Sequence, residues 1–255
     1  MRTRVYVDGF NLYYGALKDT AFKWLDPVKL AYQLLPAGYS VSKLKYFTAR
    51  VSGIQDAGAP ARQQAYLNAL ATLPEVEVLW GNFLSKTIWR PLSNLPVAGR
   101  QIHTPNPVTM PAGDHPVSGP TQTLPVGTYH QPAKGTKRRR RRTRPHPDAV
   151  VTEVHTMEEK GSDVNLAVHL LNDAWKQSFD AAVVISNDTD LVTPIRMVSV
   201  EQGRPVFVVC PSGKRMAAPL AAVATHKRHV RTAMLRAAQF PKNIPGTAVS
   251  KPVSW

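Results

Sequence analysis

The stretch Asp-Ala-Ala-Val-Val-Ile-Ser-Asn-Asp-Thr-Asp-Leu (180–191) decides the fold class. Residues 180–186 form a short, mostly apolar run, which is typical of a strand buried inside a parallel sheet. The polar residues after it lead into residues 191–202, which we expect to form a helix that Gly203 ends. A buried strand followed at once by acids and a helix indicates a β-to-α junction of an α/β fold.

The same alternation of strand and helix extends over most of the chain. Short β-rich runs predict strands at 3–8, 41–51, 75–84, 180–186 and 205–210. Between them, helix patterns lie at 10–18, 26–35, 60–72, 163–176, 191–202 and 215–238. In the helix 163–176, the core face is expected to be Val164, Ala167, Val168, Leu171 and Trp175. Strands separated by helices of this length predict an α/β fold with a mostly parallel sheet of about five strands.

Residues 91–147 interrupt this pattern. They hold 11 of the 22 prolines, together with many Thr, Gly and His residues and a run of arginines. Such a composition does not bury enough apolar area to offset the entropy of ordering the chain, so we interpret the stretch as a mostly disordered insertion. At its base, Ile88-Trp89 and residues 149–154 are expected to pair as two strands. The insertion therefore splits one domain, residues 1–240, and we interpret 241–255 as a C-terminal tail.

The composition bounds the class of protein. With 255 residues, 43% of them hydrophobic, the chain can bury a sizeable core. No apolar run approaches the roughly 20 residues of a membrane span, and the N-terminus does not resemble a signal peptide. Cys210 is the single cysteine, which excludes an intramolecular disulfide and a cysteine-rich zinc site. We therefore expect a cytoplasmic protein that does not enter a membrane.

The net charge of +15 is unevenly distributed. Residues 134–144 hold eight Lys or Arg and residues 202–255 hold nine, and neither segment holds an acid. The other 15 basic residues are outweighed by all 17 acids, so the rest of the chain carries a net charge of −2. Basic segments beside an acidic remainder indicate a surface that binds a polyanion, and charge for solubility alone is the alternative.

Four aspartates lie at the ends of the predicted elements. Asp8 ends the first strand, Asp163 opens a helix, and Asp188 and Asp190 follow the strand 180–186. In an α/β sheet, such positions gather in one crevice beyond the carboxyl ends of the strands. Carboxylates gathered there repel one another unless a cation lies between them, and oxygen-only ligand sets suit Mg²⁺ or Mn²⁺. The pattern therefore predicts a metal site formed by these side chains.

Asp8 indicates a metal site less specifically than the pair Asp188 and Asp190 does. Asp8 also fits a helix N-cap, although Gly9 after it would let a ligand approach the backbone and Asn11 lies one turn away. Asp188 and Asp190 are two acids two residues apart, and a simple turn needs only one. This pair favours a metal-dependent phosphoryl-transfer site.

The acidic segment before the helix 163–176 leaves more alternatives open. The helix dipole alone would explain Asp163, but Ser162 is available as the cap, so Asp163 is not needed for that role. Lys160 could bind a phosphate as a point charge or be an ordinary surface lysine. His169 could reach the site or simply pack on the helix face.

Three motifs together resemble the NYN domain family, the LabA-like or DUF88 relatives of PIN-domain nucleases. They are Val-Asp-Gly-Phe-Asn-Leu-Tyr-Tyr-Gly (7–15), Glu-Lys-Gly-Ser-Asp-Val-Asn-Leu-Ala (159–167) and Ser-Asn-Asp-Thr-Asp-Leu (186–191). The resemblance covers about residues 1–90 and 150–240. The ending, Gln-Phe-Pro (239–241) with Lys-Pro-Val-Ser-Trp (251–255), is similar to that of bacterial DUF88 proteins.

This resemblance implies a PIN-like three-layer α/β/α sandwich and an Mg²⁺- or Mn²⁺-dependent endoribonuclease. Carried over, the acidic positions of the family are Asp8, Asp163, Asp188 and Asp190, with Asn11 and Thr189 beside them. We expect Asp8 and Asp188 to bind the cation directly, and Asp163 and Asp190 directly or through water. Asn11 is expected among the catalytic residues, and Thr189 and Lys160 among the RNA contacts. The implied reaction is in-line attack of a metal-activated water on a phosphodiester.

Single-stranded RNA is the expected partner, and a homo-oligomer is possible. Basic residues in the insertion would contact phosphates without reading bases, namely Lys137, Arg138, Arg139, Arg140, Arg141 and Arg142. Tyr13, Tyr14 or Trp89 could stack on bases. A nuclear-localisation role for the basic run is disfavoured by the bacterial-type ending. Two other functions stay open: a non-catalytic RNA- or partner-binding module on a PIN-like scaffold, and hydrolysis of a small phosphoester, against which the basic run argues.

Overall fold

We describe a computed structural model of the chain, which covers residues 1–53, 56–91, 151–211, 213 and 215–255. The chain divides into two compact units, and each is described by itself. The first unit joins Met1–Phe83 to Glu159–Trp255, and the second is Leu84–Glu158. Two segments that are distant in the sequence therefore build one body.

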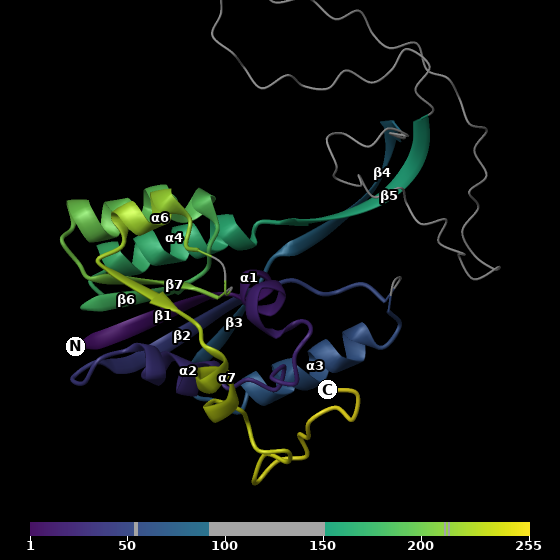
Figure 1. Cartoon of the computed structure of the whole chain (residues 1–255), viewed down its shortest axis with the longest axis horizontal. Helices are drawn as coiled ribbons and strands as arrows, with labels where there is room; N and C mark the ends of the chain where they lie inside the picture. The colour runs from purple at the N-terminus through teal and green to yellow at the C-terminus, as the bar shows by residue number, and fades with distance from the viewer. Residues whose placement is uncertain (54–55, 92–150, 212, 214) are drawn as a thin grey trace, which may run out of the picture. The chain divides into compact units, whose positions relative to one another are not determined.

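The first unit is built on a six-stranded sheet in which every pairing is parallel (Figure 1). Its strand order is β3-β2-β1-β6-β7-β8. The strands are β1 (Arg2–Asp8), β2 (Ser40–Thr48), β3 (Val76–Trp80), β6 (Ala181–Ile185), β7 (Val206–Cys210) and β8 (His226–His229). Strands β6 and β7 are buried along their whole length, as expected for apolar strands covered on both faces. The α/β prediction is confirmed, with six strands in place of about five.

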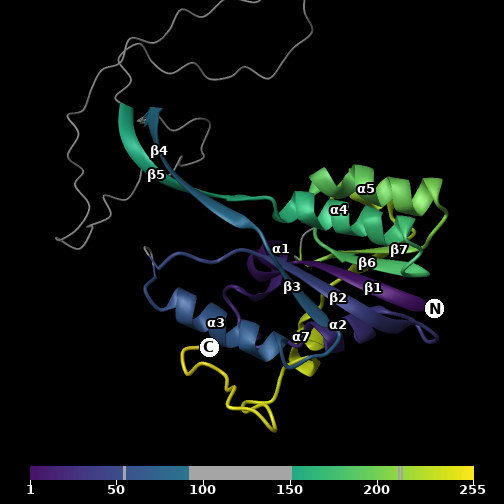
Figure 2. The same ribbon diagram turned by 180° about the vertical axis from the view of Figure 1, so that it is seen from behind.

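Helices cover both faces of this sheet (Figure 2). One face carries α1 (Gly9–Leu12), α2 (Pro27–Leu34), α3 (Ala59–Leu70) and α7 (Thr232–Ala237). The other carries α4 (Ser162–Trp175), α5 (Val192–Arg196) and α6 (Ala218–Val223). Shorter turns complete them: π-helical η1 (Tyr13–Leu17) and η3 (Met197–Glu201), and 3₁₀ η2 (Thr189–Leu191). None of the helices in the described part has the length and hydropathy needed to cross a bilayer.

The predicted start of α2 is confirmed in detail. The Asp26 carboxylate accepts hydrogen bonds from the backbone N–H groups of Val28 and Lys29, each at 3.0 Å. Pro27 takes the first helical position, where its missing N–H costs nothing. The start of this helix could therefore be predicted from the local sequence alone, because Asp-Pro precedes an apolar run.

The prediction of one helix over 215–238 is wrong. The segment forms α6, then the edge strand β8, and then α7. Strand β8 pairs in parallel with β7, from Phe207 with His226 to Cys210 with His229. The alanine-rich composition favoured a helix, but the open edge of β7 offers backbone partners that local propensity does not anticipate.

Helix α4 also presents a different face to the sheet from the one expected. Its buried apolar residues are Leu166, Leu170 and Ala174. Val164, Val168 and Trp175, which we expected in the core, are 65%, 57% and 83% exposed. The helix carries two apolar stripes, and spacing alone does not reveal which of them meets the sheet.

The second unit contains a two-stranded sheet formed by β4 (Asn82–Pro91) and β5 (Val151–Lys160). This confirms the expected pairing of strands at the base of the insertion. Residues 92–147, for which we expected disorder, lie outside the described residues.

The segment 241–255, interpreted as a tail, packs against the rest of the first unit. Ile244 is buried, and the Trp255 ring lies 6.2 Å from the Trp24 ring. The Trp24 Nε1–H also donates a hydrogen bond to the Pro241 carbonyl at 2.9 Å. The ending therefore contacts Trp24, which lies more than 200 residues earlier in the chain, and these contacts could not be predicted from the local sequence.

Candidate active site

Asp8 lies at the carboxyl end of β1 and is only 6% exposed. Its Oδ1 accepts a hydrogen bond from the Asn11 backbone N–H at 2.8 Å, which makes Asp8 the N-cap of α1. Its Oδ2 accepts a second hydrogen bond from the Ser186 hydroxyl at 2.9 Å. Asp8 is therefore a helix N-cap, which was the alternative to a ligand role. Its second oxygen contacts the loop that follows β6.

That loop brings the second pair of acids to the same edge of the sheet. Parallel pairing of Val7 with Ile185 sets Asp8 beside the residues after β6. The Asp188 carboxylate caps η2 by accepting a hydrogen bond from the Asp190 N–H at 2.9 Å. Asp188 is half-buried, whereas Thr189 and Asp190 are exposed.

Asp163 approaches the same edge from the first turn of α4. The expected cap is wrong, because Gly161 precedes the helix with a φ of 96° and no side chain caps it. The Ser162 hydroxyl is buried and has no hydrogen-bond partner in the described part of the chain. Only glycine adopts this left-handed backbone without strain, so the turn before Asp163 depends on Gly161.

The electrostatics show that these carboxylates face one another. Burial raises the pKa of Asp8 to about 6, and the charges of Asp163 and Asp188 add to the rise, against the hydrogen bonds that Asp8 accepts. Burial likewise raises the pKa of Asp163, with further contributions from Asp188 and Asp190. The four aspartates predicted from the sequence therefore act on one another across the carboxyl edge of β1 and β6.

Two residues that the prediction did not assign hold this edge together. The Ser186 hydroxyl donates to Asp8 and accepts a hydrogen bond from the Asp188 N–H at 3.1 Å. The Asn187 N–H donates to the Asn11 side-chain oxygen at 3.1 Å, and the Asn187 side-chain oxygen accepts from the Ala217 N–H at 2.9 Å. Both residues stand inside the motif 186–191, where polar residues between a buried strand and two acids were the available signal.

Gly9 is required by the packing between neighbouring parts of the chain. A Cβ atom added at Gly9 would lie 2.7 Å from the Phe47 carbonyl oxygen and 2.7 Å from the Tyr46 ring. Gly9 therefore permits a close approach between the β1–α1 junction and β2. It lets the chain turn away immediately after Asp8.

The remaining candidates lie elsewhere or are not described. His169 belongs to a buried group beneath α4, where its Nδ1 lies 3.0 Å from the Lys45 ammonium. Burial and the Lys45 charge lower the pKa of His169. Lys160 ends β5, but its side chain lies outside the described part, as do Lys137 to Arg142 and the side chain of Trp89. Tyr14 is 63% exposed on η1 and remains available to stack on a base.

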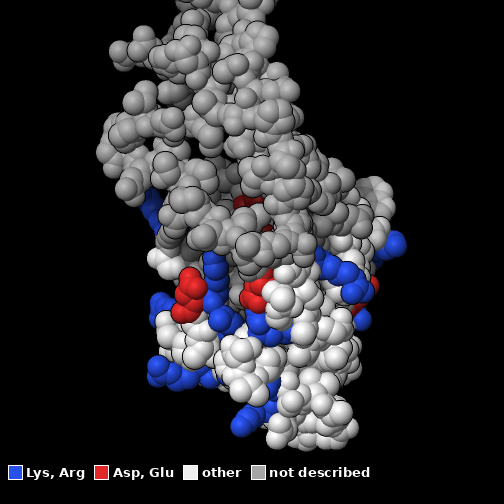
Figure 3. Space-filling model, turned by 90° about the vertical axis from the view of Figure 1, so that its right-hand side faces the viewer, with Lys and Arg blue, Asp and Glu red and all other residues white. Residues whose placement is uncertain are grey.

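Within the described residues, no group of three or more His, Cys, Asp or Glu side chains is arranged to hold a metal ion. The donor chemistry of the aspartates nevertheless fits a hard divalent cation, because all the ligand atoms are carboxylate oxygens. Mg²⁺ usually keeps several waters and takes only one or two carboxylates, so a closed protein cage is not required. Figure 3 shows Lys and Arg side chains spread over the described surface of one side of the molecule, with Asp and Glu at fewer places.

Residues 137–230 match the NYN domain family. The chain carries an NYN domain. NYN domains are PIN-like, and the match covers less than half of the chain. The match includes Asp163, Asp188 and Asp190 and begins after Asp8, which joins the NYN residues through the pairing of β1 with β6.

The chain is also similar to two known proteins. It is 28% identical over 283 residues to 6-hydroxy-3-succinoylpyridine 3-monooxygenase HspA of Pseudomonas putida, covering 100% of this chain and 75% of that protein. A crystal structure of the protein of unknown function VPA0982 from Vibrio parahaemolyticus aligns with 12% identity and a TM-score of 0.46. That alignment covers 91% of this chain and 93% of the other, and it is too distant to support an argument.

Proposed function

We propose that the protein is a metal-dependent endoribonuclease that hydrolyses phosphodiester bonds of single-stranded RNA at the Asp8 edge. The observation that carries the proposal is that Asp8 lies buried at the edge where the charges of Asp163 and Asp188 act on it; burial first, and these two charges second, raise the pKa of Asp8 to about 6. Buried carboxylates that repel one another are unfavourable for stability, which is typical of a site built for a cation and not for the fold. The NYN match over three of the four aspartates supports the reaction class.

Mg²⁺ or Mn²⁺ would be held by Asp8 and Asp188, with Asp163 and Asp190 assisting directly or through water. A cation bound there supplies Lewis acidity and a water of lowered pKa. The chain itself orients these ligands: Ser186 holds Asp8 and the Asp188 backbone, and Asn11 holds the loop after β6. Exposed Thr189 and Tyr14 are suited to contact the RNA at the rim.

The cleavage experiment uses a labelled single-stranded RNA pool with Mn²⁺ or with EDTA. Asp188→Asn and Asp8→Asn should lower the cleavage rate by more than about 100-fold, since even partners that only orient metal ligands contribute about 10- to 100-fold. Asp180→Asn is the matched control. Asp180 directly precedes β6 and pairs with Arg2, whereas Asp188 follows the other end of the same strand. Equal cleavage by wild type and both site variants would contradict the proposal.

Cation binding can be measured without any reaction. Mn²⁺ should raise the thermal midpoint of the wild type, because a ligand at 100 times its Kd stabilises the native state by about 2.7 kcal/mol. The shift should disappear in Asp188→Asn and persist in Asp180→Asn. A shift that is equal in all three proteins would place the cation elsewhere.

Two competing functions are separated by the same samples. A non-catalytic RNA-binding module predicts binding that survives Asp188→Asn, weakens steeply with salt and is accompanied by no cleavage. The similarity to the Pseudomonas monooxygenase over the whole chain favours a second candidate, hydroxylation of a pyridine. Turnover of 6-hydroxy-3-succinoylpyridine with dioxygen and a reductant, in a protein that leaves RNA intact, would favour that candidate.

A further inference from the structure

The exposed face of α4 carries a continuous apolar stripe. It consists of Val164, Val168, Leu171 and Trp175, of which Val164, Val168 and Trp175 are 65%, 57% and 83% exposed. The buried face of the helix, with Leu166 and Leu170, is on the opposite side. A stripe at spacings of four, three and four residues is the pattern by which one helix packs against another. In the first unit, as described, Val164, Val168 and Trp175 meet solvent, whereas Leu171 is half-buried and also packs against the core beneath α4.

The spacing of the stripe reads the same in both directions along the helix. An antiparallel copy would therefore set Val164 opposite Trp175 of the second chain, and Val168 opposite Leu171. We propose that α4 is the interface of a homodimer, in which two copies pack antiparallel about a two-fold axis between Val168 and Leu171. A two-fold interface needs a self-complementary patch, and this symmetric stripe is one.

The charges on α4 suit this pairing. Asp173 and His169 turn inward, where both contact the Lys45 ammonium, so neither lies on the stripe. The two ends of the stripe are flanked by opposite charges: the half-buried Asp163, which also interacts with the acids of the Asp8 edge, precedes Val164, and the exposed Lys176 follows Trp175. Antiparallel packing brings unlike charges to each end, whereas parallel packing would bring like charges together. The electrostatics thus favour a second copy in the antiparallel direction.

The area is also of the right order for a dimer core. An aromatic side chain buries about 150–250 Å², and Trp175 presents most of its surface to solvent. Val164 and Val168 add to this exposed apolar surface, and apolar patches larger than a few hundred Å² mark interaction sites. A standard interface needs about 800 Å² from each partner, so a polar rim must add to the stripe.

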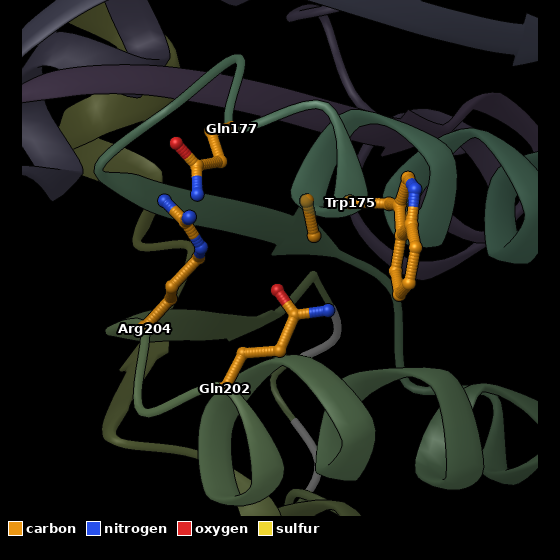
Figure 4. Close-up of a pocket in the computed structure, with 5 residues that line it drawn as sticks. Trp175, Gln177, Gln202 and Arg204 are labelled. Atoms are coloured by element: carbon orange, nitrogen blue, oxygen red, sulfur yellow. The ribbon is translucent and has the colours of Figure 1, made fainter.

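That rim is present beside Trp175. A hollow of about 440 Å³ is lined by Ala174, Trp175, Gln177, Gln202 and Arg204. In Figure 4 the Trp175 ring stands at one side of this hollow, with the Gln202 amide and the Arg204 guanidinium group across from it. Polar groups around an apolar centre are the usual anatomy of a protein interface.

The test measures the oligomeric state of the full chain between about 1 and 100 µM, a range that captures micromolar dimers. Wild type should be a dimer, and Val168→Glu and Trp175→Glu should weaken the dimer at least 10-fold while the circular dichroism spectrum is unchanged. Tyr32→Glu is the control, because Tyr32 is a 49% exposed aromatic residue on α2. A monomeric wild type over this range, or dimers unaffected by both α4 variants, would overturn the proposal.

The antiparallel register has its own test, which does not depend on any nuclease activity. Val164→Cys and Trp175→Cys proteins, mixed and treated with a short thiol crosslinker, should give a mixed dimer. Each variant alone should stay uncrosslinked, since Cys210 is buried. Crosslinks within either single variant, without mixed dimers, would overturn the antiparallel arrangement.

Discussion

Two carboxylates on the same helix, Asp163 in its first turn and Asp173 near its end, have opposite surroundings. Asp173 accepts hydrogen bonds from the Lys45 ammonium at 2.7 Å and the Tyr6 hydroxyl at 2.8 Å, and its other oxygen pairs with Arg4 at 2.7 Å. Burial raises the pKa of Asp173, but these partners outweigh it and leave the pKa below its ordinary value. Asp163 has a raised pKa from burial and from neighbouring acids.

This difference separates a structural carboxylate from a candidate functional one. The Asp173 carboxylate is compensated inside the protein by two cations, Arg4 and Lys45, and these ion pairs link α4 to β1 and β2. At the Asp8 edge, the charges that act on the buried carboxyl come from other acids. A buried carboxylate whose pKa is raised by other acids is stabilised by binding a cation. A carboxylate that is already paired with cations of the protein gains much less from one.

The largest stability effect is expected at Asp173. Asp173→Asn leaves the buried Lys45 and the half-buried Arg4 without a counter-charge, and breaking a buried pair costs about 3–5 kcal/mol of the free energy of unfolding. Urea denaturation at neutral pH measures the loss. Asp163→Asn, on the same helix, is the control and should cost far less. Equal losses in the two variants would remove the distinction between the two regions.

Replacement of Asp8 should act in the opposite direction. Since the pKa of Asp8 is raised from 3.8 to about 6, its ionised form destabilises the native state at neutral pH. Asp8→Asn, in EDTA at pH 7.5, should therefore gain stability, by at most about 3 kcal/mol at about 1.4 kcal/mol per pKa unit. The same substitution should abolish cleavage.

The stability that Asp8→Asn gains over the wild type should depend on pH. A proton on wild-type Asp8 favours the folded state, and that contribution is complete below pH 3.8 and is lost as the pH rises through 6. The advantage of Asp8→Asn should therefore shrink as the pH falls from 7 to 4. An advantage that stays constant over this range would show that the charge of Asp8 is not its cause.

The two regions also differ in how far the sequence predicts them. The Asp8 edge could be anticipated, because each acid directly follows a recognisable strand or opens a helix, and parallel strands end at one edge. The Asp173 group could not, because Lys45 is 128 residues away in the sequence and Tyr6 is 167 away. Asp173 lies on the buried face of α4 and interrupts the apolar spacing there. The spacing therefore predicts that the stripe with Trp175, which is exposed, forms the core face. The strand β8 was missed for a related reason, since only the open edge of β7 makes it a strand.

The smallest effect is expected at Asp180, which has a cationic partner but no burial. Its carboxylate pairs with Arg2 at 3.2 Å, and both side chains are largely open to water. Hydrogen bonds from the Arg2 backbone N–H and side chain lower the pKa of Asp180, but water and salt screen the charges. Asp180→Asn should leave the thermal midpoint close to that of the wild type, at low and at high salt. A large loss there would mean that pairing with arginine alone, without burial, accounts for the stability assigned to Asp173.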